Sequence, residues 1–117
     1  MKLTEITFDT ARPVDGYGPG FFRVADQVVQ GAILVTSAGV SSWGGLADDA
    51  PLLALAGKVD VIFVGTGEQI SHLPADLRDK LEDSGLGVEP MASPAACRTY
   101  NILLSEGRRI ALAALPV

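Results

Sequence analysis

The chain has 117 residues, of which 48% are hydrophobic and 20% are charged. This length fits one domain over residues 1–117, and the apolar content suffices to cover both faces of a modest sheet. The net charge of −5 and the scattering of the nine basic residues argue against a nucleic-acid partner, because binding to a phosphate backbone needs clustered Lys and Arg. The single cysteine excludes an intramolecular disulfide and a cysteine-cluster metal site.

The first residues, 1–5, lack the apolar core of a secretory signal, and no run of about 18 apolar residues could span a bilayer. We therefore expect a protein of the cytoplasm or of an organelle matrix, without a membrane span. The single cysteine is compatible with such a reducing compartment.

The amino-terminal part predicts two strand regions around a loop. Leu3, Ile6 and Phe8 alternate with polar residues, as in a first strand. Residues 10–20 hold two prolines and three glycines, which weaken both ladders and helices, so we expect a loop. Residues 21–30 are typical of a short hairpin or of a bent edge strand.

A further strand over 32–36 is expected to lead into a connector of small residues over 37–45, which holds the only tryptophan, Trp43. A connector seldom keeps tryptophan without burying its ring, so we expect Trp43 to anchor this segment to the domain. The alternative is an exposed partner-binding residue, because tryptophan is enriched in binding hot spots. Residues 46–58 predict a short helix that ends at Gly57.

The central feature of the sequence is the β-branched apolar run 59–64, which stops at the turn Gly65-Thr66-Gly67. Continuous apolar character, rather than strict alternation, predicts a strand that is covered on both faces, as in sheets packed between helices. The two glycines allow the backbone to turn sharply and to approach a neighbouring segment closely.

The second half of the chain predicts an alternation of helices and strands. The segments are a helix over 74–84, a strand over 86–90, a helix from Ser93 to Gly107 and a strand over 108–115. Ser93-Pro94 provides an N-cap that is followed by proline at the first helical position. The residues expected on the inward faces of the two helices are Leu73, Leu77 and Leu81, then Ala96, Tyr100, Leu103 and Leu104.

The strands that end at Gly65 and at Glu89 should run parallel, which places their carboxyl ends at one edge of the sheet, where open α/β sheets have their crevices. The start of the next helix adds free N–H groups, which suit an anion or a carboxylate. The candidate crevice is lined by Gly65, Thr66, Gly67, Glu68, Met91, Ala92 and Ser93. The alternative is that the glycines only let the strand turn beneath Trp43 or Tyr100.

The sequence contains no complete catalytic, metal or cofactor motif, so we expect neither an enzyme nor a bound cofactor. Cys97 lies one turn inside a helix, where the dipole favours a thiolate, but nothing in the sequence brings a base to it, and we expect a small core residue. His72, the only histidine, is expected at the surface or near a helix cap. Glu68 and Glu89 could form a carboxylate pair, although acids at strand ends are usually solvated.

Several residues together resemble the Mth-type domain family over nearly the whole chain. They are Trp43, the strand into Gly65-Thr66-Gly67, Pro74, Leu77, Gly85-Leu86 with Val88, Ala96, Thr99-Tyr100-Asn101 with Leu103, Gly107 and Arg109. This family includes bacterial and archaeal proteins of unknown function, the mitochondrial respiratory complex I assembly factor and an adipogenesis-associated human relative. The resemblance implies a three-layer α/β/α fold with a mixed central sheet of about five strands.

The resemblance also implies protein partners and no established catalysis. Tyr100 and Asn101 match the family's pair on the last long helix, which adds both residues to the candidate site. The Tyr100 ring can be buried while its hydroxyl finds a partner, and the Asn101 amide can bond the backbone of an adjacent loop. The members that act in complex I assembly imply a peripheral association with membranes through a partner complex.

Two classes of function follow from these observations. The favoured class is a non-enzymatic binding or assembly protein that resembles the complex I assembly factors. The alternative is a small-molecule or anion-binding protein, or an enzyme, that uses the crevice at Gly65-Thr66-Gly67.

Overall fold

The structure is a computed structural model that describes residues 12–117. The predicted strand at Leu3, Ile6 and Phe8 lies outside these residues. In chain order the elements are β1 (Val14–Gly18), β2 (Phe21–Val24), β3 (Gln27–Gln30), β4 (Ile33–Thr36), β5 (Gly39–Ser42), α2 (Ala50–Leu53), β6 (Val61–Gly65), α3 (Ala75–Asp83), β7 (Gly87–Met91), α4 (Ser93–Ser105) and β8 (Ile110–Ala114).

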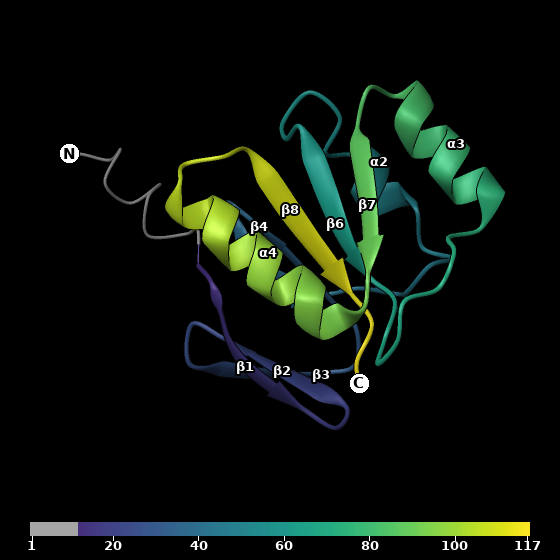
Figure 1. Cartoon of the computed structure of the whole chain (residues 1–117). Coiled ribbons are helices and arrows are strands. Elements are labelled where there is room, and N and C mark those ends of the chain that lie inside the picture. Colours follow the sequence, from purple (N-terminus) through teal and green to yellow (C-terminus); the bar gives the residue numbers. More distant parts are fainter. Residues whose placement is uncertain (1–11) are drawn as a thin grey trace.

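The main sheet has five strands in the order β5-β4-β8-β6-β7 (Figure 1). Strand β4 runs antiparallel to both β5 and β8, whereas β6 runs parallel to both β8 and β7. The sheet is therefore mixed, as the resemblance implied. The strands predicted over 32–36, 59–64, 86–90 and 108–115 all lie in it.

Side chains alternate along the strands, which divides the apolar core between two faces of the sheet. Ile33 and Val35 of β4 pack with α4, whereas Leu34 packs with α2 and α3 on the other face. In Figure 1, α4 lies in front of the five-stranded sheet with β1, β2 and β3 below it, and α2 lies behind. The fold is a three-layer α/β/α arrangement with a small second sheet beside α4.

The small sheet has the strand order β1-β2-β3, and both pairs are antiparallel. The hairpin expected over 21–30 is confirmed, but the loop expected over 10–20 is wrong for Val14–Gly18, which forms β1. Gly18 pairs with Phe21, and a Cβ at Gly18 would lie 2.6 Å from the Phe21 ring. The aromatic ring therefore covers a glycine, which explains how a glycine-rich segment supports a strand.

Two predictions between β4 and β6 need correction. The connector expected over 37–45 contains strand β5, which pairs with β4 across a turn at Ser37 and Ala38. The helix expected over 46–58 is only the four-residue α2. Before α2 the backbone forms a loop, in which the Asp48 carboxylate accepts a hydrogen bond from the Gly44 N–H.

The remaining elements agree with the sequence pattern. Leu77 and Leu81 are buried on α3, and Ala96 and Tyr100 are buried on α4 together with Cys97. None of the helices in residues 12–117 combines the length and the apolar character that a membrane span requires.

Candidate functional site at the carboxyl ends of β6 and β7

Strands β6 and β7 are parallel neighbours whose following helices lie on opposite faces of the sheet. The chain leaves β6 toward α3, whose leucines belong to one core cluster, and leaves β7 toward α4, whose inner residues belong to the other. Such a divergence of adjacent connections is where ligands bind in many open α/β sheets. Most of the site residues predicted from the sequence lie at this position.

Ser93 connects three segments at this edge of the sheet. The Ser93 Oγ accepts a hydrogen bond from the Gly67 N–H at 2.9 Å and donates one to the Leu115 carbonyl at 2.6 Å. The Ser93 N–H in turn donates to the Gly67 carbonyl at 2.7 Å. Ser93 is only 1% exposed, so both hydrogen-bonding directions of its hydroxyl are used inside the protein.

The structure corrects the predicted role of Ser93 as a helix cap. Ala92 is the N-cap residue of α4, and Ser93 is the first helical residue. Its hydroxyl therefore serves the loop after β6 and the segment after β8 rather than the free N–H groups of its own helix. A helix boundary displaced by one residue changes which neighbours a side chain can reach.

The two positions of the turn require glycine for different physical reasons. A Cβ at Gly65 would lie 2.6 Å from Ser93 Oγ and 2.9 Å from Ser93 Cα, so only glycine allows this approach. Gly67 has a φ of +103°, a backbone conformation that L residues rarely adopt. Space is not the constraint there, because the atom nearest to an added Cβ would lie 3.8 Å from it. Gly65, Gly67 and Ser93 are all buried, and Ser93 contacts both glycines.

Thr66 holds the loop that leads from β6 to α3. Its N–H donates to the Met91 carbonyl at 2.8 Å, and its Oγ1 accepts from the Ser71 N–H at 3.0 Å. The hydroxyl proton can be donated either to the Gln69 carbonyl at 2.9 Å or to that of Met91 at 3.1 Å. The loop therefore has a defined course, and Glu68 is exposed on it.

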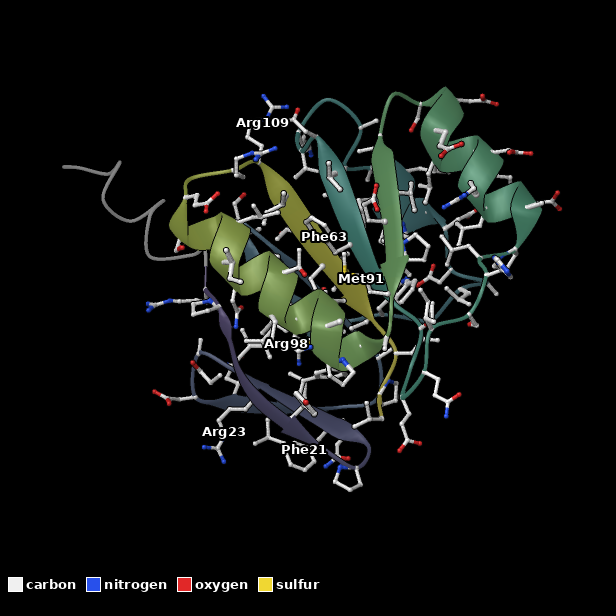
Figure 2. The ribbon with its side chains drawn as sticks, in the orientation of Figure 1. Phe21, Arg23, Phe63, Met91, Arg98 and Arg109 are labelled. Atoms are coloured by element: carbon white, nitrogen blue, oxygen red, sulfur yellow. The ribbon has the colours of Figure 1, made fainter. Side chains whose placement is uncertain are left out.

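Met91 and Ala92, the next two predicted site residues, are half-buried where β7 meets α4. Figure 2 shows Met91 and Phe63 on the face of the sheet beside α4, where Met91 packs against the apolar cluster that contains Phe63. Met91 thus contributes to packing.

Tyr100 and Asn101 do not join the residues around Ser93. The Tyr100 hydroxyl donates to the Arg12 carbonyl at 3.2 Å, and burial raises the pKa of this hydroxyl to about 12. The Asn101 amide both accepts from the Val14 N–H at 2.8 Å and donates to the Val14 carbonyl at 2.9 Å. The Tyr100 hydroxyl has a partner and the Asn101 amide bonds backbone groups, as expected, but Val14 is the first residue of strand β1 and not part of a loop. The two side chains attach α4 to the start of β1.

The side chains considered for catalysis lie in different environments, since Cys97 is buried and the others are exposed. Cys97 is buried, and desolvation raises the pKa of its thiol to about 11 against a smaller opposing effect of Arg98. His72, Glu68 and Glu89 are exposed. The thiol is therefore protonated at neutral pH, as expected for a core cysteine rather than a nucleophile. In the part of the chain that the structure describes, no group of three His, Cys, Asp or Glu residues could hold a metal ion.

Trp43 is an anchor, as predicted. It is 5% exposed, packs in the core cluster on the α3 side, and its indole N–H donates to the Asp48 carbonyl at 2.9 Å. This geometry contradicts the alternative of an exposed binding residue. Sequence reasoning missed Asp48 and Leu115, because the contacts that they make with Trp43 and Ser93 follow from the folded path and not from residue spacing.

Comparison with known proteins agrees with this architecture. Residues 14–115 match the profile of the family described as "Protein of unknown function (DUF498/DUF598)". The chain belongs to this family. An uncharacterized protein of Rhodobacter capsulatus is 49% identical over 117 residues, which cover 100% of this chain and 94% of that protein.

A relative of this DUF498/DUF598 protein with a functional name is "NADH dehydrogenase [ubiquinone] 1 alpha subcomplex assembly factor 3" of Danio rerio. It is 30% identical over 107 residues, which cover 86% of this chain and 62% of the zebrafish factor. The chain thus spans less than two thirds of that assembly factor.

Solved structures show the same fold. A crystal structure described as an outer membrane protein from Bartonella henselae has a TM-score of 0.85 and 32% identity, covering 94% of this chain and 98% of that one. A solution structure from Bordetella pertussis, described as an Mth938-like domain, has a TM-score of 0.76 and 32% identity. The match covers 99% of this chain and 92% of that chain. The resemblance to the Mth-type family is confirmed.

Proposed function

We propose that this member of the Mth-type family is a non-catalytic binding or assembly protein that acts on other proteins. The observation that carries the proposal is the likeness to the zebrafish complex I assembly factor over 86% of this chain. Because this chain spans only 62% of that factor, the proposal concerns the shared domain and leaves the factor's whole activity aside.

The environment of Ser93 and Cys97 on α4 supports a binding role. The Ser93 hydroxyl uses both of its hydrogen bonds within the fold, and the Cys97 thiol is buried with its pKa raised to about 11. Neither side chain is prepared to act as a nucleophile, since a nucleophile needs an accessible atom and an adjacent base.

We further infer that the partner is a respiratory NADH dehydrogenase or one of its subunits. The protein would then act from the cytoplasm, or from an organelle matrix, and would reach the membrane only through that complex. Deleting the gene in the source organism tests this inference. Native gels should show less complete NADH dehydrogenase and an accumulation of partial complexes, and expression of the full chain should reverse both effects. Normal assembly after deletion would refute the respiratory role.

The predicted small-molecule or anion site at Gly65-Thr66-Gly67 stays a prediction. A ligand there would have to separate Gly67 from Ser93, because both residues are buried and bonded to each other. A thermal-shift titration with metabolite pools would favour this class if a metabolite raised the melting temperature of the wild-type chain.

A further inference from the structure

Two cavities lie beside α3, and they differ in whether their basic side chain forms an ion pair. The larger has a volume of about 440 Å³ and is lined by Leu46, Ala47, Asp49, Pro74, Asp76, Leu77 and Lys80. Within it, the Lys80 Nζ lies 2.9 Å from the Asp49 carboxylate, which raises the pKa of Lys80. The cation of this cavity is therefore already paired, and its second acid, Asp76, carries further negative charge.

The smaller cavity has a volume of about 370 Å³ and opens between the β6–α3 loop and α3. It is lined by Ile70, Ser71, His72, Arg78 and Pro90. None of these residues is acidic, and the Arg78 guanidinium forms no ion pair with any residue from 12 to 117. Although the chain has a net charge of −5, the described residues that line this cavity include basic side chains and no acid.

An apolar side chain stands beside these basic groups on a loop of defined shape. Ile70 is 66% exposed, the most exposed large apolar residue in the described part of the chain. Its loop, seen between β6 and α3 in Figure 1, is fixed by the bonds that join Thr66 to Gln69 and Ser71. A preordered loop loses little conformational entropy when it binds, so it suits recognition of a partner.

We propose that this cavity receives a carboxylate side chain of a protein partner while Ile70 packs against an apolar residue next to that carboxylate. The proposal rests on the proposed function as a binding protein. The Arg78 guanidinium matches a carboxylate in planar geometry, and His72 and Ser71 offer further hydrogen bonds. A polypeptide fits better than a free anion, because a polypeptide can contact Ile70 and the basic side chains of the cavity at the same time. The negative net charge disfavours a nucleic-acid backbone.

Site-specific photo-crosslinking tests the proposal in the full chain, expressed in the source organism. p-Benzoylphenylalanine replaces Ile70 in one variant and, as a matched control, Ile102, which is 58% exposed on α4. Mass spectrometry then identifies the crosslinked segment. We expect residue 70, but not residue 102, to crosslink a protein segment with Asp or Glu next to an apolar residue.

Charge variants in the crosslinking chain test the role of Arg78. Arg78→Gln should lower the yield about tenfold, as expected for a lost hydrogen-bonded charge pair. Lys80→Gln is the control, because Lys80 lies on the same helix but is paired with Asp49, and it should leave the yield within about twofold. Arg78→Glu should regain crosslinking when the partner's acid is replaced by lysine.

A crosslinked segment without carboxylates would overturn the proposal, and so would equal crosslinking yields with and without the Arg78→Gln substitution. An NMR titration with succinate tests a free anion instead. Shifts of the Arg78 and His72 signals with succinate, in the absence of any crosslinked protein, would also overturn the proposal. Crosslinks at residue 102 alone would refute this docking site but would not contradict the proposed assembly function. Crosslinks at neither position, together with normal NADH dehydrogenase assembly after gene deletion, would remove both.

Discussion

Cys97 shows how burial outweighs position along a helix. It lies in the second turn of α4, where the helix dipole favours a thiolate, yet desolvation raises the pKa of its thiol to about 11. The packing around the thiol, which the sequence pattern indicated through its apolar neighbours, therefore decides its chemistry.

This raised pKa predicts a loss of stability at alkaline pH. Below about pH 9 the thiol is protonated in both states; between about pH 9 and pH 11 it ionises only in the unfolded chain. The free energy of unfolding should therefore fall by up to about 3 kcal/mol over this range, since each pKa unit is worth about 1.4 kcal/mol. Urea denaturation of the wild type and of Cys97→Ala at several pH values measures it. The variant should show a smaller decline, and rapid alkylation of native Cys97 at neutral pH would contradict the premise.

The β2–β3 turn carries local strain at Ala25. Ala25 and Asp26 have φ values of +52° and +64°, the mirror-image turn of tight hairpins, in which asparagine is common and alanine is not. Ala25→Asn should therefore raise the free energy of unfolding by about 0.5–1 kcal/mol. The matched control is Ala38→Asn in the β4–β5 turn, where φ is not positive. Equal effects of the two substitutions would show that backbone strain at Ala25 is not the cause.

At the level of elements, hydrophobic pattern predicted the interior strands and the longer helices but failed where glycine and polar residues form strands. The residues of β1 and β5 read Val-Asp-Gly-Tyr-Gly and Gly-Val-Ser-Ser, which lack a clear alternation. The pairing of β1 is supported by Phe21, whose ring covers Gly18. Such cross-strand contacts lie outside any single-segment pattern.

The candidate site, like the fold, was predictable only in part. Parallel strands with a crossover helix placed the Gly65 turn beside the start of α4, and the contact of Gly67 with Ser93 agrees with that juxtaposition. The sequence did not reveal that the segment after β8 passes the same place, where the Leu115 carbonyl accepts the Ser93 hydroxyl proton. A terminal segment without periodicity gives no signal of its path.

The hydroxyl of Ser93 joins three elements, which predicts a larger effect than the loss of a helix cap. Ser93→Ala should lower the free energy of unfolding by about 2–3 kcal/mol, because it leaves the buried Gly67 N–H without its acceptor. Ser105→Ala is the control, since Ser105 is exposed on the same helix and its hydroxyl donates to the Ile102 carbonyl three residues away. Chemical denaturation compares the two, and a difference below about 0.5 kcal/mol would contradict the assigned role.

In the molecule as a whole, one sheet is shared by two apolar cores. Trp43 and Leu34 belong to the core on the α3 side, whereas Cys97 and Val35 belong to the core on the α4 side. Because Leu34 and Val35 are adjacent residues of β4, neither core can be lost without disturbing the strand that supports the other.

The shared sheet predicts a single cooperative unfolding transition. Trp43 fluorescence and thiol labelling of Cys97 report on opposite faces, and their urea midpoints should coincide. Labelling of Cys97→Ala provides the background signal. Reactivity of Cys97 at a lower urea concentration than the fluorescence change would instead mean that α4 opens before the rest of the fold.

The contacts of Tyr100 and Asn101 have a consequence for the solubility of the chain. Among residues 12–117, β1 is one of the two outer strands of the small sheet, and unpaired backbone groups on such a strand are a template for amyloid-like association with another molecule. The Asn101 carboxamide acts as a surrogate peptide group that occupies both polar atoms of Val14, and the Tyr100 hydroxyl occupies the Arg12 carbonyl. Helix α4 thereby closes the start of β1 to intermolecular strand addition.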